Sequence, residues 1–124
     1  MTTPRDDLQD ALAEAAPLVT VYAEEPITAP TLPALVIRPG SPYREAGELP
    51  HCLERWRLEV VALVPIDAVA PLDMLDELVD TVRDVILATP AAKYNGVRSQ
   101  PARVEMAGKS MRGAIVELDI ETEG

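Results

Sequence analysis

The chain has 124 residues and a formal charge of −10, with one tryptophan, three tyrosines and no phenylalanine. Eleven basic residues against twenty-one acidic ones argue against a broad nucleic-acid-binding surface, because such surfaces neutralise phosphate with Lys and Arg. The single cysteine, Cys52, excludes an internal disulfide and a thiolate metal cage. The length fits one domain over residues 1–124.

Neither a leader nor a membrane span is expected. The amino end becomes acidic where a secretory signal would be basic. The longest apolar run, residues 60–66, is far shorter than the ~20 residues that cross a bilayer. We therefore expect a soluble protein.

The first third of the chain predicts one helix followed by short extended segments. Apolar residues recur at helical spacing over residues 6–16 and favour a short amphipathic helix. Residues 18–22 are expected to form a first strand or an extended lead-in. Prolines between residues 24 and 33 remove backbone donors, which is typical of an edge or a linker. Residues 35–37 then predict a short strand that ends at Arg38.

Residues 39–50 contain three prolines and two glycines and follow neither the helical nor the strand period. This composition predicts a long surface loop. Loops of this length in a small domain are usually functional or mobile, so we expect it to be a contact surface.

The rest of the chain predicts a long strand, a long helix and a hairpin. Residues 55–64 alternate like a strand at the centre of a sheet, and their second half is expected to be covered on both faces. Residues 72–88 carry an apolar stripe against an acidic face and predict the main helix. Residues 102–107 and 111–121 predict two strands joined by a turn at residues 108–110. The order predicts an α+β fold with a small mixed or antiparallel sheet and helices on one face.

No motif indicates catalysis, a cofactor or a metal. His51 and Cys52 are adjacent, but neighbours on a strand point to opposite faces and the chain has no second histidine. The glycines are too scattered for a phosphate loop, and the acids of residues 73–84 have helical rather than calcium-loop spacing. Trp56 between Arg55 and Arg57 fits a core tryptophan better than a nucleic-acid stacking platform. We expect no enzyme activity.

The acidity itself is the remaining signal. Like charges along one strand face repel, so Glu117, Asp119 and Glu121 are harder to explain as ordinary solvated residues than the helix acids are. A negative surface of this kind suits the wall of a channel through which DNA slides without sticking. The competing assignment for that wall is the acidic face of the main helix, formed by Asp73, Asp76, Asp80 and Asp84.

The layout as a whole resembles the tail terminator proteins of long-tailed bacteriophages. The matching segments are the helix that begins DDLQDAL at residues 6–12, the loop of residues 39–50, the strand WRLEVV at residues 56–61, the helix of residues 72–88, and the final strand AIVELDI at residues 114–120. The resemblance implies a homohexameric ring in the virion, at the head-proximal end of the tail tube. It also implies three partners: further copies of the chain, the major tail tube protein and the head connector.

Residue chemistry adds a prediction for the contacts of such a ring. Arginine and tyrosine are enriched at the centres of protein interfaces. The residues expected at subunit or tube contacts are therefore Arg38, Tyr43, Arg44, Arg55 and Arg57. With −10 charges per copy, part of the ring's hole is expected to be acidic, so that DNA passes without specific binding.

Three other functions stay open at this point. The chain could be another head–tail joining or tail-completion protein, which would bind filled heads rather than tail tubes. It could be a small-molecule enzyme or ligand-binding domain, which would need convergent polar groups in a pocket. It could also be a bacterial scaffold protein without a phage role.

Overall fold

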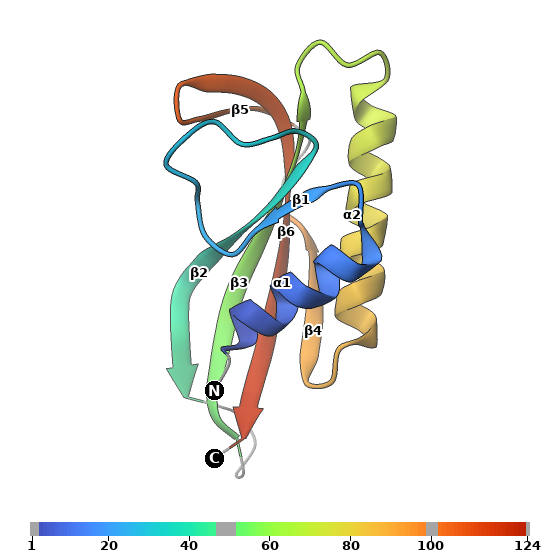
Figure 1. Cartoon of the computed structure of the whole chain (residues 1–124). Helices are drawn as coiled ribbons and strands as arrows, with labels where there is room; N and C mark the ends of the chain where they lie inside the picture. Colours follow the sequence, from blue (N-terminus) through green and yellow to red (C-terminus); the bar gives the residue numbers. More distant parts are fainter. Residues whose placement is uncertain (1–2, 47–51, 99–101, 124) are drawn as a thin grey trace.

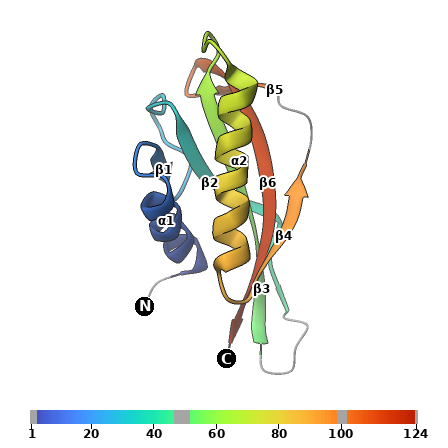
Figure 2. The same cartoon turned by 90° about the vertical axis from the view of Figure 1, so that its right-hand side faces the viewer.

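The computed structural model of the chain describes residues 3–46, 52–98 and 102–123, and the side chains of these residues except at positions 52, 53 and 123. Within this part of the chain, two helices pack on one face of a six-stranded mixed sheet (Figures 1 and 2). The elements are α1 (Pro4–Ala15), β1 (Thr20–Tyr22), β2 (Ala34–Ala46), β3 (Cys52–Pro65), α2 (Pro71–Ala88), β4 (Ala92–Val97), β5 (Ala102–Met106) and β6 (Lys109–Glu123). The expected α+β fold is confirmed.

The strand order is β1-β2-β3-β6-β4, and β5 pairs with the first part of β6 beyond the end of β4. β1 runs parallel to β2, and every other pair is antiparallel. The long strand expected over residues 55–64 is β3, which lies in the middle of the sheet as predicted. Because β3 and β6 pair along almost their whole lengths, they fix which residues lie side by side on each sheet face.

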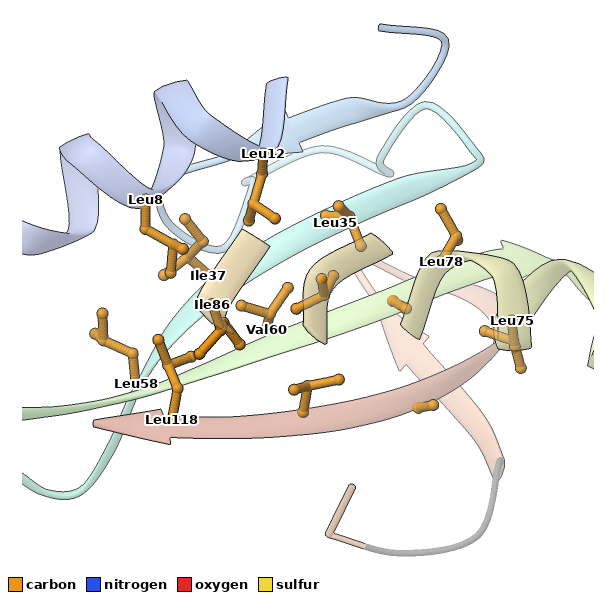
Figure 3. Packing of buried hydrophobic residues seen from close by; sticks show 14 of the residues in the cluster. Leu8, Leu12, Leu35, Ile37, Leu58, Val60, Leu75, Leu78, Ile86 and Leu118 are labelled. Carbon is orange, nitrogen blue, oxygen red and sulfur yellow. The ribbon is translucent and has the colours of Figure 1, made fainter. Parts of the chain in front are cut away.

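The main core lies between the helices and the sheet. Alternate residues of β3, such as Leu58 and Val60, point toward the helices and are fully buried there. Figure 3 shows Leu8 of α1 and Ile86 of α2 pointing into the same cluster from above the strands. Each such side chain contributes about 1.5–3 kcal/mol by burial, so apolar contacts are what hold the helices on the sheet.

A second, smaller core covers part of the opposite sheet face. It contains Val36 of β2, Val61 and Leu63 of β3, and Met106 and Met111 from the β5–β6 hairpin. The hairpin folds over the end of the sheet where β3 leads into α2 (Figure 1). The prediction that the second half of β3 is covered on both faces is confirmed.

The helix starts and ends follow local chemistry. α1 begins two residues earlier than expected, because Thr3 caps it: its hydroxyl accepts from the Asp6 amide at 3.2 Å, and Asp6 accepts from the Thr3 amide at 3.3 Å. Pro71 occupies the first turn of α2, where a missing amide hydrogen costs nothing. The helix predicted over residues 72–88 is therefore confirmed, and Pro71, which suits a first helical position, is its first residue.

The predicted loop of residues 39–50 is wrong over residues 39–46, which continue β2. Two features of the strand explain the error. β1 pairs only with Ala34–Val36, so the outer edge of β2 beyond that point tolerates prolines. The pairing with β3 also shifts between Pro39 and Arg44, which hides the alternating pattern. Residues 47–50 lie outside the described part of the chain.

The sequence also missed β4 and misplaced the last turn. β4 carries a register irregularity between Tyr94 and Gly96, which breaks its period. The last turn consists of Ala107 and Gly108, with φ of 53° and 79°, so β6 begins at Lys109 rather than at residue 111. Two consecutive positive φ angles are typical of a tight hairpin turn.

Candidate functional site

One half of the sheet face opposite the helices is covered by charged side chains. We call it the open charged face, and it comprises Arg38, Glu45, Arg55, Arg57, Glu59, Lys93, Arg98, Glu117, Asp119 and Glu121. These are five cations and five carboxylates among the described residues. The face is therefore balanced in charge, although the chain as a whole carries −10.

Glu59 lies at the centre of this face and is the one charged residue that is buried in the described part of the chain, with 6% of its surface exposed. Its carboxylate accepts from Arg38 Nη2 at 3.0 Å and from Arg98 Nη1 on its other side. Arg98 follows β4, and its amide donates to the Ile115 carbonyl of β6 at 2.9 Å. The Glu59 carboxylate, which belongs to β3, thus connects β2 with the segment after β4. β3 and β6 lie between these two segments in the sheet.

Glu45 makes a second bridge on the same face. Its Oε1 accepts from Arg55 Nε at 2.7 Å and from Arg57 Nε at 3.0 Å. These bonds, first the one from Arg55 and then the one from Arg57, hold the pKa of Glu45 below its usual value of 4.5. The bridge ties the outer part of β2 to β3.

The strand acids predicted as a channel wall lie beside these arginines. Register places Glu117 opposite Glu59, Asp119 opposite Arg57, and Glu121 opposite Arg55. On the other side of β6, Lys93 lies opposite Asp119. The three acids do share a face, as expected, but that face carries five cations for its five carboxylates. The face is therefore not acidic as a whole, and the assignment of these acids to a channel wall stays a prediction.

The predicted contact residues separate onto two faces. Arg38, Arg55 and Arg57 belong to the open charged face, whereas Tyr43 and Arg44 lie on the helix side of the sheet next to Trp56. The shift in β2 register produces this change of face.

Trp56 organises this second group and is 9% exposed, which confirms the prediction of a core tryptophan. Tyr43 meets it edge-on with ring centroids 5.2 Å apart, and the Arg44 guanidinium lies 4.3 Å from its ring centre. Arg44 Nε also donates to Glu54 at 2.8 Å, which lowers the pKa of Glu54 from 4.5.

The net negative charge of the chain resides mainly in the helices. α1 and α2 together contain nine carboxylates and two arginines, a net charge of −7. The acids are Asp6, Asp7, Asp10, Glu14, Asp73, Asp76, Glu77, Asp80 and Asp84. We call this surface the acidic helix layer; it includes all four residues of the competing channel assignment.

Sequence reasoning missed the residues that hold the open charged face together. The sequence did contain a signal for Glu59, because this charged residue lies between the apolar Leu58 and Val60 of a predicted strand. Arg98 and Lys93 carried no signal, because β4 itself was missed. Glu45 was assigned to a loop, so its partners on β3 were not foreseen.

The described ranges contain no group of three or more His, Cys, Asp or Glu side chains placed to hold a metal ion. Neither α1 nor α2 is long and apolar enough to cross a membrane. His51 and the Cys52 side chain lie outside the described part.

Comparison with known proteins adds no relative: no protein-family model matches the chain, and no curated protein is significantly similar to it.

Proposed function

We propose that the chain is a structural protein of a bacteriophage tail, without enzyme activity or a cofactor. In this proposal, identical copies form a homohexameric ring at the head-proximal end of the tail tube. The ring stops polymerisation of the major tail protein and presents a docking face to the head connector. The chain is assembled in the host cytoplasm and then resides in the neck region of the virion.

The observation that carries the proposal is the partition of charge between the two faces of the sheet. The open charged face is balanced, whereas the acidic helix layer has a net charge of −7. Balanced patterns of opposite charge give register and specificity in protein contacts. Surfaces of one negative sign repel phosphate, so DNA passes them without binding.

This partition supports a revised assignment of the ring surfaces. The channel wall is assigned to the acidic helix layer, which includes the exposed Asp76 and Asp80 of α2, in place of Glu117, Asp119 and Glu121. Contacts between copies are assigned to the open charged face, where Glu117 and Asp119 make no ion pair among the described residues and are available to a neighbour's cations. A ring needs such contacts between different surfaces of successive copies.

Tyr43 and Arg44 are assigned to contact with the tail tube. They lie near the end of β2, and that end of the strand points toward the chain termini in Figure 1. Tyrosine and arginine near the end of a strand are suited to contact with a partner protein, because both are enriched among the residues that contribute most to binding energy.

Electron microscopy of purified chain with polymerised major tail protein tests the proposal. We expect rings at one end of each tube and no further growth from that end. A chain that leaves tubes uncapped and binds filled heads instead would be a head–tail joining protein. A chain that binds neither would overturn the phage assignment.

A further inference from the structure

We propose that the end of the molecule opposite the chain termini binds the head connector, through a connector segment that carries an aliphatic side chain next to a carboxylate. We call this end the hairpin end. It comprises the β3–α2 connection of residues 66–70, the first turn of α2 and the β5–β6 hairpin. The identity of the partner rests on the proposed function, whereas the chemistry of the bound segment follows from the surface itself.

The hairpin end and the predicted tube contact lie at opposite ends of the molecule. Figures 1 and 2 show the β3–α2 connection and the β5–β6 hairpin at one end, and the chain termini at the other. Tyr43 and Arg44, assigned to the tail tube, lie near the end of β2 that points toward the termini. A ring between tube and connector needs two such surfaces, so the hairpin end is the one left for the connector.

The β3–α2 connection exposes several aliphatic side chains close together. Among the described residues, seven large hydrophobic side chains are exposed, and three of them lie within seven positions here. Ile66 is 42% exposed, Val69 is fully exposed, and Leu72 at the start of α2 is 53% exposed. Exposed apolar side chains that gather in this way are typical of protein contacts, because a partner removes them from water.

A hollow of about 290 Å³ adjoins these side chains. Its walls include Ala70, Pro71 and Leu72 on one side and Arg112 of β6 on the other. An aliphatic side chain of a partner that enters the hollow would bury apolar surface of Pro71 and Leu72. The hollow thus offers an apolar contact directly beside a guanidinium group.

Two arginines lie directly opposite each other on the hairpin. Register pairs Arg103 of β5 with Arg112 of β6, so their side chains share one face, where like charges repel. Arg103 lies 3.8 Å from Glu105, but both side chains are more than half exposed, so this pair is weak. Arg112 makes no ion pair among the described residues, and its buried Nε has no hydrogen-bond partner among them.

A partner's carboxylate near the two guanidinium groups would relieve this repulsion. Guanidinium and carboxylate groups form charge-assisted, often paired hydrogen bonds. Residues 102–112 contain three cations and one carboxylate, a net charge of +2, in a chain that carries −10 overall. The hairpin is therefore a positively charged segment that attracts an acidic partner.

A second copy of the chain and DNA both fit the hairpin end less well. In the proposed ring, the acidic helix layer of each copy lines the channel and its open charged face is covered by a neighbour, so neither surface reaches this end. DNA phosphates would pair with the arginines, but the exposed Ile66, Val69 and Leu72 gain nothing from a duplex backbone. A protein segment with aliphatic and acidic side chains uses both features.

Asp73 also lines the hollow and provides an internal control. It forms no ion pair with Arg112. Asp73 lies in the first turn of α2, where the helix dipole favours a negative charge without help from Arg112. Its carboxylate repels an incoming carboxylate, so Asp73→Asn should strengthen binding of the proposed segment.

The chemistry of the hairpin end is tested on the full-length chain alone. N-acetyl-leucine, which joins an aliphatic side chain to a carboxylate, is titrated into isotope-labelled protein while NMR records the backbone amide shifts. N-acetyl-leucinamide is the control compound, with the same side chain and no charge. We expect saturable shifts concentrated in residues 66–73 and 103–112, and about fivefold weaker binding of the amide.

Variants then locate the site. Arg112→Gln is expected to weaken binding of N-acetyl-leucine about fivefold, and Leu72→Ser about threefold, because they remove a charge partner and an apolar wall. Arg83→Gln and Leu87→Ser, also on or beside exposed positions but away from the hollow, are the matched controls and should change binding less than about twofold. Urea denaturation confirms that each variant is folded.

The identity of the partner is tested with tail tubes and filled heads. Tubes capped by each variant are mixed with heads, and electron microscopy counts the tubes that carry a head. Val69→Ser combined with Arg103→Glu should reduce head attachment about tenfold and leave tube capping unchanged. Arg44→Glu should instead reduce capping, because Arg44 is assigned to the tube.

Failure of this proposal is distinguishable from failure of the proposed function. If the unmodified chain caps no tubes, the phage assignment and the connector as partner fall together, even where N-acetyl-leucine binds. If capping is normal and the combined Val69→Ser and Arg103→Glu variant attaches heads normally, the hairpin end is not the connector site and the ring stands.

Three results in solution would also overturn the proposal. The first is equal weakening of N-acetyl-leucine binding by Arg112→Gln and Arg83→Gln, which would indicate attraction to net charge alone. The second is a loss of binding in Asp73→Asn as large as in Arg112→Gln, because Asp73 would then hold Arg112. The third is self-association in sedimentation that Val69→Ser abolishes, because the occupant would then be a second copy.

Discussion

The open charged face and the acidic helix layer contain similar numbers of ionisable side chains, but the first is balanced in charge and the second is strongly negative. On the open face, strand register places five cations among five carboxylates. On the helices, nine carboxylates face two arginines. Net charge calculated from a sequence therefore says little about any one surface, because pairing between distant strands decides which charges become neighbours.

The two regions also differ in what their charges do for the fold. The helices attach through apolar stripes, and of their acids Asp6 caps α1 while Asp80 and Asp84 pair locally with Arg83. On the open face, Glu59 and Glu45 bridge different strands, so charge and stability are coupled there. Substitutions in each region test whether its charged residues contribute to the stability of the fold.

The largest effect on the free energy of unfolding is expected in the core between the helices and the sheet. Ile86 is fully buried in the core cluster. Ile86→Ala should lower the free energy of unfolding by about 3 kcal/mol, through lost burial and the cavity left behind. Urea denaturation measures this loss, and the neighbouring Leu87→Ala, at a 67% exposed position, is the control with little expected change.

A smaller loss is expected for the buried carboxylate of the open face. Glu59→Gln removes the charge that faces Arg38 and Arg98, and it should cost about 1–2 kcal/mol of unfolding free energy. Glu117→Gln, one strand away, should cost less than about 0.5 kcal/mol. Equal costs for the two variants would show that the Glu59 bridge has no special structural role.

The titration of Glu45 tests whether its bridge to β3 also stabilises the fold. Its pKa is lowered in the folded chain, so its bridge stabilises the fold above pH 4.5 and is lost as pH falls through the lower folded value. Arg55→Gln should raise the pKa of Glu45 toward 4.5. NMR titration of the side-chain carboxyl carbon measures this change. Arg83→Gln, on α2, should leave the Glu45 titration unmoved, and a similar shift in both variants would contradict the assignment.

The smallest effect is expected on the outward side of the helices. Asp76 is exposed, and its substitution by Lys reduces repulsion among the α2 acids. Asp76→Lys should change the free energy of unfolding by less than about 0.5 kcal/mol in urea denaturation. A loss above about 1 kcal/mol would mean that the helix acids support the fold after all.

The fold class, both helices and the central strand were predictable because their patterns are local. Burial of Leu75, Leu78, Val82 and Ile86 follows from the helical period of α2 alone. Prolines and a register shift concealed the outer part of β2, and an irregularity at Gly96 concealed β4. Both failures occurred at sheet edges, where pairing on one side only relaxes the requirement for a regular pattern.

The candidate surfaces were predictable only as sets of residue types. The strand acids share a face, which alternation alone indicates. Their cationic neighbours, Arg57 and Lys93, come from positions about 60 and 25 residues away, and only the register of β3 and β4 with β6 places them there. Likewise, the separation of Arg44 from Arg38 depends on an irregularity within β2 that the sequence does not reveal.

A cryo-electron microscopy structure of tail tubes capped by this chain would test the proposed ring and the assignment of its two surfaces most directly. We expect a closed ring in which the open charged face is buried against the neighbouring copy, and in which Asp76 and Asp80 of α2 point into the central channel. A ring with its helices on the outer surface and the strand face around the channel would contradict the assignment of the two surfaces.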